Sequence, residues 1–180
     1  MNISKKIKIR KNILIKTLSI SFLSILLFTN VVCKKDTDVI KTDTSHVKEN
    51  KYKFIKQGEV YFQDKNKNLK KQIDIELAET PEKQHLGLMF RENMEESQGM
   101  LFIFSIEETQ AFYMKNTIMP LDIIFITAKK EIVKIYKNTT PYSEKDLPSL
   151  QPILYVVEVK AGFCDKYNIK ESDFIDWRKN

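Results

Sequence analysis

Seven short runs of β-branched and aromatic residues, separated by short polar connections, dominate the sequence after residue 51. In one of them Ile73, Ile75 and Leu77 alternate with polar residues, which is the period of a half-buried strand. Closely spaced strands favour antiparallel pairing, because parallel pairs need a long crossover. The fold class that we predict is mainly β, a compact antiparallel β-sandwich or partly closed barrel. The predicted strands are residues 59–63, 72–77, 100–104, 111–114, 121–126, 131–136 and 153–159, and residues 169–177 are predicted to form a turn and a last short strand.

Two short helices interrupt this pattern. Thr80, Pro81 and Glu82 form a helix start, with a hydroxyl cap, a proline in the first turn and an acid near the positive end of the dipole. We expect this helix to continue to about Phe90 and a second one to cover residues 161–167. The side chains of the first helix that we expect to face the sheet are Leu86, Met89 and Phe90.

The beginning of the chain has the composition of an export signal. Residues 17–32 form an uncharged, largely apolar run, shorter than the ~20 residues of a membrane-spanning helix. We therefore predict a signal peptide over residues 1–32. Extending the run back to Ile13 gives the alternative of an uncleaved anchor. Six basic residues precede the run, and they account for the whole net charge of +6. They are Lys5, Lys6, Lys8, Arg10, Lys11 and Lys16.

Cys33 follows the apolar run directly, which resembles the lipobox of bacterial lipoproteins, where this cysteine is acylated. Asn30 and Val32 stand where that pattern usually has Leu and a small residue. Lipidation with chains such as palmitate would hold the protein on a membrane. We predict a lipidated cysteine and flexible tether over residues 33–51, followed by a single β-rich domain over residues 52–180. The expected location is the bacterial cell envelope, on the periplasmic or surface side of a membrane.

The folded part carries almost no net charge and has few groups for metal or nucleophilic chemistry. A neutral body lacks the clustered Lys and Arg that neutralise phosphates, so we expect no nucleic-acid partner. His85 is the only histidine after residue 51, and neither CxxC nor HExxH occurs, so we expect no metal site and no cofactor. The GxSxG elbow is absent as well. Cys164 lies between apolar neighbours, and we expect a buried rather than a reactive thiol.

The methionines are concentrated in one part of the chain, where five of the six fall within 31 residues. Soft thioethers bind copper(I), but Met also fills irregular gaps in apolar cores. Because these residues lie beside Leu, Phe and Ile, we expect core packing. They are Met89, Met94, Met100, Met114 and Met119.

Polar residues within or beside apolar strands are the candidate binding site. On the alternation of residues 121–126, Asp122 shares a face with two isoleucines and points inward, and Glu158 is flanked by valines. Buried charges are costly unless they are paired, so both carboxylates need partners. Either the group is a hydrogen-bonded cluster that pins the corner 114–122 to the sheet, or it lines a pocket for a polar ligand. The candidate residues are Arg91, Lys115, Asn116, Thr117, Asp122 and Glu158.

Five blocks occur in an order that resembles the domain of unknown function family 192. They are TPEKQHLGLMFRENM, QGMLFIF, FYMKNTIMPLDIIFI, VVEVKAGF and IKESD. The resemblance covers about residues 73–175 and implies an antiparallel β-sandwich of jelly-roll type, in proteins that are often exported. It implies no established activity, cofactor or catalytic residue. Tyr113 and Met119 depart from the family's usual residues. The positions that match are Gly87, Met89, Arg91, Gly99, Met100, Lys115, Asn116, Thr117, Pro120, Asp122, Glu158 and Gly162.

Three functional hypotheses follow. The first is a lipid-tethered protein without enzymatic activity that binds a small polar ligand or an envelope protein. Its lip would be residues 115–117 with Arg91, covered by the loop 139–151. The second is a hydrolase that uses Asp122 and Glu158 as an acid/base pair, as in glycoside hydrolysis, which requires both carboxyls to open onto one cleft. The third makes the polar cluster purely structural.

Overall fold

The structure, a computed structural model, describes residues 52–180 and is mainly β with two short helices, as predicted. A seven-stranded sheet and a two-stranded sheet contain all the strands of this part of the chain. The strands are β1 (Gly58–Gln63), β2 (Leu69–Ala78), β3 (Gln98–Glu108), β4 (Ala111–Phe112), β5 (Leu121–Ile126), β6 (Ile132–Tyr136), β7 (Leu147–Pro148), β8 (Ile153–Lys160) and β9 (Phe174–Lys179). The helices are α2 (Pro81–Leu86) and α3 (Phe163–Lys166).

The large sheet has the strand order β6-β5-β8-β3-β2-β1-β9. All its neighbouring strands pair antiparallel except β2 and β3, which run parallel with Glu76 opposite Met100. The expectation of purely antiparallel pairing is therefore wrong at this pair. The reason lies in the connection, because the chain between β2 and β3 includes α2 and is long enough for a crossover.

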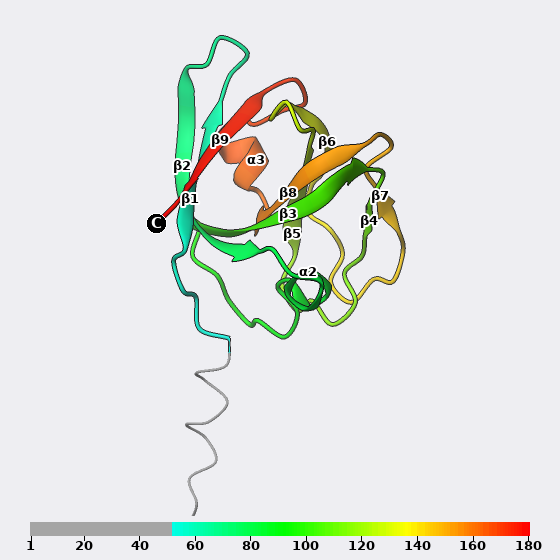
Figure 1. Ribbon diagram of the computed structural model, residues 1–180. Helices are drawn as coiled ribbons and strands as arrows, with labels where there is room; N and C mark the ends of the chain where they lie inside the picture. Colours follow the sequence, from blue (N-terminus) through cyan, green and yellow to red (C-terminus); the bar gives the residue numbers. More distant parts are fainter. Residues whose placement is uncertain (1–51) are drawn as a thin grey trace, which may run out of the picture. The chain divides into compact units, whose positions relative to one another are not determined.

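The large sheet curls so that its two edge strands approach each other without forming a closed barrel. Glu131, just before β6, forms a bridge with Phe174 of β9, and the Ile132 amide donates to the Asp173 carbonyl at 2.8 Å. Inside the curl lies α3 (Figure 1). Its side chains form one hydrophobic core with side chains of β1, β2, β3, β5, β6, β8 and β9. Cys164 of α3 is fully buried in this core, which confirms the predicted buried thiol.

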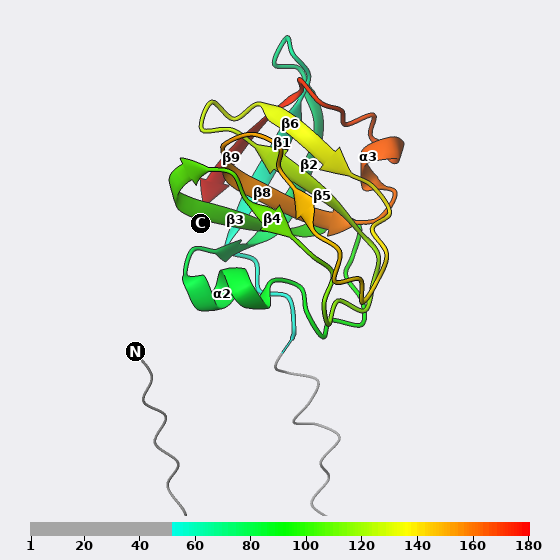
Figure 2. The same cartoon turned by 90° about the vertical axis from the view of Figure 1, so that its right-hand side faces the viewer.

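A second core lies on the other face of the sheet, against β3, β8 and β5. The connection that contains α2 and the small β4–β7 sheet lie over this face (Figure 2). Four methionines belong to this core and Met89 is also buried, which confirms the prediction of methionine packing. The four are Met94, Met100, Met114 and Met119.

The helix α2 begins where the sequence predicts but ends earlier. The Thr80 hydroxyl accepts from the Lys83 amide at 3.3 Å, which is the expected N-cap. The helix stops at Leu86 because Gly87 adopts φ +47°, outside the helical region. Leu86 and Phe90 are consequently exposed rather than turned to the sheet.

The predicted signal peptide, Cys33 and the tether lie outside the described residues. Within residues 52–180, neither helix has the length and apolar character needed to cross a bilayer.

Candidate functional site

The corner between β4 and β5 is held together by its own backbone. Asn116 adopts the left-handed conformation with φ +57°, and the Thr117 amide donates to the Met114 carbonyl at 3.0 Å. The Met114 amide donates to the Ser143 carbonyl at 2.8 Å, which joins the corner to the long loop. These backbone hydrogen bonds fix the shape of the corner and join it to the loop.

Asp122 is fully buried and serves as an acceptor for three backbone N–H groups. The amides of Asn138 and Cys164 each donate to it at 2.9 Å, and that of Gly162 donates at 3.3 Å. The carboxylate thereby links β5, the start of α3 and the chain that leaves β6. Its partners are backbone amides rather than the side chains of Arg91, Lys115 or Asn116, and its role is structural.

Glu158 lies on the opposite face of the sheet from Asp122. In the register of β5 and β8, Asp122 stands opposite Val159, and Glu158 stands opposite Ile123. Successive residues of a strand point to opposite faces, so the sheet itself separates the two carboxyls. They do not open onto one cleft, and this contradicts the hypothesis of an Asp122–Glu158 acid/base pair.

The Glu158 carboxyl is buried without a complete set of hydrogen-bond partners in the described residues. The residue is 5% exposed, and its Oε2 atom has no hydrogen-bond partner among the described residues. Burial raises the pKa of Glu158 to about 8, because a carboxylate loses its hydration there, and the charge of Arg91 opposes part of this shift. Buried polar atoms without partners are rare in folded proteins, so this oxygen needs an explanation.

Arg91 cannot fully neutralise Glu158 because it is already paired. Its guanidinium forms an ion pair with Glu76 of β2, and the Ile55 amide donates to the same carboxylate at 3.0 Å. Glu76, Met100 and Glu158 face one another across β2, β3 and β8, so they stand in one row on the same face. Two carboxylates and one guanidinium therefore share this face.

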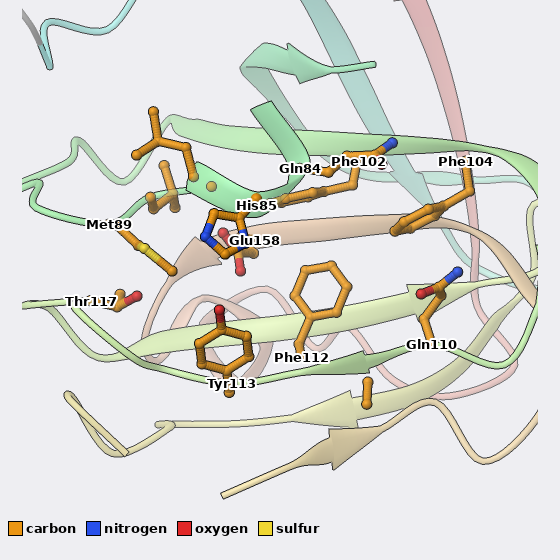
Figure 3. Close-up of a pocket in the computed structure, with 14 residues that line it drawn as sticks. Gln84, His85, Met89, Phe102, Phe104, Gln110, Phe112, Tyr113, Thr117 and Glu158 are labelled. Carbon is orange, nitrogen blue, oxygen red and sulfur yellow. The ribbon is translucent and has the colours of Figure 1, made fainter. Parts of the chain in front are cut away.

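A pocket of about 220 Å³ opens in front of Glu158, between α2 and β4. Its lining combines aromatic rings with a few polar groups (Figure 3). The close-up shows the Glu158 carboxyl and the Tyr113 hydroxyl directed into the same space, with the His85 ring above them. The lining residues are Gln84, His85, Leu86, Gly87, Leu88, Met89, Phe102, Phe104, Gln110, Ala111, Phe112, Tyr113, Thr117 and Glu158.

Gly87 lies beside the Glu158 carboxyl and carries no side chain. A Cβ atom at this position would lie 3.6 Å from Glu158 Oε2 and 3.3 Å from Cζ of Phe102. Any side chain here would occupy the approach to the carboxyl, and the φ of +47° disfavours one in any case.

The pocket walls are fixed by hydrogen bonds between segments far apart in the sequence. Gln84 of α2 donates to the Ile103 carbonyl of β3 at 2.8 Å, which holds the helix over the sheet. The Phe90 amide donates to the Asn116 carbonyl at 2.9 Å, which ties the segment after α2 to the corner. The ring of Phe112 packs edge-on against Phe102, with centroids 5.0 Å apart.

The long loop 139–151 supports the pocket from behind rather than covering it. Its strand β7 pairs with β4, and the Ser149 amide donates to the Gln110 carbonyl at 2.8 Å. No residue of this loop belongs to the lining of the pocket. The loop instead contacts the predicted lip, since the Tyr142 amide donates to the Thr117 carbonyl at 3.2 Å and Lys115 faces Glu144.

The structure brings part of the predicted site together. Glu158 and Thr117 line the pocket, and Arg91 lies close enough to affect the pKa of Glu158. Lys115 is half-exposed and faces Glu144, with Nζ and Oε1 3.7 Å apart, and it is outside the lining. Asn116 is exposed, but its carbonyl helps to hold one wall.

Sequence reasoning missed the aromatic wall, including Phe102, Phe104, Phe112 and Tyr113. Phe102 and Phe104 are two residues apart in a strand and therefore share a face, which was a usable signal. Glu76 was missed too, because its place in an alternating strand is also typical of a solvent-exposed residue.

The fold and the site define a small mainly-β protein with a buried acidic group in an aromatic pocket. The model of the DUF192 family, described as "Uncharacterized ACR", matches residues 62–177, so the chain belongs to this family. No curated protein matches the sequence.

Two solved structures show the same fold. One is a protein named as a candidate transcription regulator from Sinorhizobium meliloti. It is 30% identical with a TM-score of 0.65, over 69% of this chain and 98% of that one. The other is a protein of unknown function from Novosphingobium aromaticivorans. It is 33% identical with a TM-score of 0.61, over 66% of this chain and 84% of that one.

Proposed function

We propose that this protein is a membrane-tethered binding protein of the bacterial cell envelope, and that the pocket between α2 and β4 takes up a small polar ligand. The observation that carries this proposal is the Glu158 carboxyl in the lining of the pocket, whose buried Oε2 atom has no hydrogen-bond partner in the described chain. A few polar groups within an otherwise apolar and aromatic wall are typical of ligand sites. A volume of about 220 Å³ suits a ligand smaller than a drug-sized molecule.

Binding is favoured over catalysis by the placement of the acidic groups. Asp122, the second carboxylate of the acid/base hypothesis, lies on the other face of the sheet, where backbone amides donate hydrogen bonds to it. The remaining polar groups of the lining are two glutamine amides, the Thr117 hydroxyl, the Tyr113 phenol and the His85 imidazole, which can donate and accept hydrogen bonds to a ligand.

The test of the pocket is a ligand-observed NMR screen with full-length protein. The panel contains small cationic, neutral and anionic compounds, and each is compared with the variant Ala111→Trp. Ala111 is exposed and lines the pocket, so a large side chain there blocks the mouth while the fold stays intact. We expect at least one compound whose binding is lost in the variant. If Ala111→Trp alters the binding of no compound in any charge class, the pocket is not a ligand site.

The tether is tested by Cys33→Ser in the native host. A lipidated protein would move from the membrane fraction to the soluble envelope fraction, because the acyl chains supply the attachment. An uncleaved anchor over residues 13–32 would instead keep the variant in the membrane. Metabolic labelling with a clickable palmitate analogue gives a second measurement, and absence of label on the wild type would exclude lipidation.

A further inference from the structure

We infer that the ligand of this pocket is a small organic ammonium compound with a short apolar body, held by an N–H donor to Glu158 and by the surrounding aromatic rings. This inference rests on the proposed function and specifies its ligand class. It follows from the charges on one face of the sheet, from the missing hydrogen bond and from the composition of the wall.

The balance of charge favours a cation. Arg91 is the guanidinium that acts on Glu158, and it is engaged in the ion pair with Glu76. With Glu76 and Glu158 both ionised, this face of the sheet carries two carboxylates and one guanidinium, so one negative charge has no positive partner. An ammonium group in the pocket would supply the missing positive charge, whereas an anion would add to the excess. A charge that is buried with a partner is far more stable than one that is buried alone.

The missing hydrogen-bond donor at Oε2 of Glu158 favours a ligand with an N–H group. Oε2 of Glu158 can accept a hydrogen bond, and no described residue provides the donor. A Cβ atom at position 87 would lie 3.6 Å from this oxygen, so the missing side chain of Gly87 removes one obstacle beside it. Charge-assisted hydrogen bonds of ammonium to carboxylate are short and about twice as strong as neutral ones.

The aromatic wall suits the same ligand. Phe102, Phe104 and Phe112 surround the space beside the carboxyl, and Tyr113 directs its hydroxyl into it (Figure 3). The faces of aromatic rings attract cations, and their carbon surface accepts an alkyl chain. A carboxylate among aromatic rings therefore recognises both ends of a short alkylammonium ion.

The test uses three probes of equal length that differ in charge: butylammonium, butan-1-ol and butyrate. Dissociation constants are measured by NMR titration of the full-length chain at pH 9, where butylammonium, like a lysine side chain, remains protonated. We expect butylammonium to bind at least about tenfold more tightly than butan-1-ol, as for a hydrogen bond to a charged group. Glu158→Gln should remove this preference, and Ala111→Trp should remove binding of all probes.

The pH dependence of butylammonium binding is a second test, because the affinity would not follow the ionisation of Glu158 if this residue had only a structural role. The titratable and charged groups around its carboxyl are Arg91, Glu76, His85 and Tyr113. Between pH 7 and pH 9, ionisation of Glu158 with a pKa of about 8 should strengthen butylammonium binding about tenfold. Binding of butan-1-ol should not increase over this range.

Each outcome decides the inference. Tighter binding of butylammonium that depends on Glu158 and on pH supports it. If butan-1-ol or butyrate binds as tightly and Ala111→Trp abolishes that binding, the ammonium inference is wrong while the proposed ligand pocket stands. If butylammonium binding survives both Glu158→Gln and Ala111→Trp, it occurs elsewhere and the inference is wrong. If none of the three probes binds, the inference also fails, and the broader screen decides the proposed function.

Discussion

Asp122 and Glu158 lie on the adjacent strands β5 and β8, one register position apart, yet their side chains point to opposite faces of the sheet. Asp122 reaches the core that contains α3, where backbone amides satisfy it. Glu158 reaches the opposite face and the pocket. Because the sheet separates them, we expect substitutions at the two positions to have separate effects, on stability in one case and on ligand binding in the other.

Asp122→Asn should destabilise the fold without altering the pocket. The amide of asparagine cannot accept from all three N–H groups, and its own NH2 group would face a donor. We expect a loss of about 2–4 kcal/mol in the free energy of unfolding, measured by urea denaturation. Asp165→Asn is the matched control, because Asp165 is exposed and its side chain pairs only with Lys137 in the described structure. An equal effect of the two variants would contradict the role of Asp122.

The Arg91–Glu76 pair should show strong energetic coupling. Both side chains are close to 10% exposed, so removing one partner leaves a largely buried charge alone. We expect Arg91→Met to cost about 3 kcal/mol and the double variant with Glu76→Leu to recover a substantial part of that loss. The double-mutant cycle is measured by chemical denaturation.

The exposed pair Lys130–Asp176 gives the reference for that cycle, since its side chains are 39% and 56% exposed. Exposed ion pairs contribute less than about 1 kcal/mol. If the coupling energy of Arg91 and Glu76 is no larger than that of this surface pair, the buried ion pair is not what holds the segment after α2 to the sheet.

Asn116 and its neighbour Lys115 should respond very differently to substitution. Asn116 adopts φ +57°, a conformation that glycine and asparagine tolerate and β-branched residues do not. Asn116→Val should lower stability by about 1–2 kcal/mol, while Asn116→Gly should be nearly neutral. Lys115→Ala should change stability by less than about 0.5 kcal/mol, because its 3.7 Å contact with Glu144 is exposed. Thermal melts of the three variants check this order, and a destabilising Lys115→Ala would contradict it.

The sequence allowed local features to be predicted well. The period-2 pattern placed Asp122 inward, and the hydroxyl–proline–acid sequence located the start of α2. It did not allow us to predict which residues far apart in the sequence come into contact. Glu76 alternates with apolar residues as an exposed side chain does, but the segment after α2 covers it with Arg91. The parallel pairing of β2 with β3 was missed for the same reason, since it depends on where a 19-residue connection returns to the sheet.

The pocket could not be assembled from the sequence because its lining comes from α2, β3, β4, β8 and the corner after β4. Each of these segments carries ordinary apolar residues when it is considered alone. Glu158 was identifiable as a charge among valines, but whether a partner neutralises it depends on Arg91, which is 67 positions away and is already committed to Glu76. The shortage of partners is a property of three segments together.

Glu158→Gln should change how stability depends on pH. In the unfolded chain the pKa of this carboxyl is near its ordinary value of 4.5, and in the folded protein burial raises it to about 8. Between these values the folded state binds a proton that the unfolded state has lost, so the free energy of unfolding falls as pH rises. The slope from this one group reaches about 1.4 kcal/mol per pH unit and vanishes above pH 8. The glutamine variant cannot lose a proton and lacks this contribution.

We therefore expect the variant to gain stability relative to the wild type from pH 5 to pH 8, measured by urea unfolding at intervals of half a pH unit. Other titrating groups, His85 included, are present in both proteins and cancel in the difference to the extent that Glu158 does not alter their pKa values. A difference in the free energy of unfolding that stays constant from pH 5 to pH 9 would mean that Glu158 is already ionised and hydrogen-bonded in the folded state. No unpartnered carboxyl would then remain for a ligand to bind.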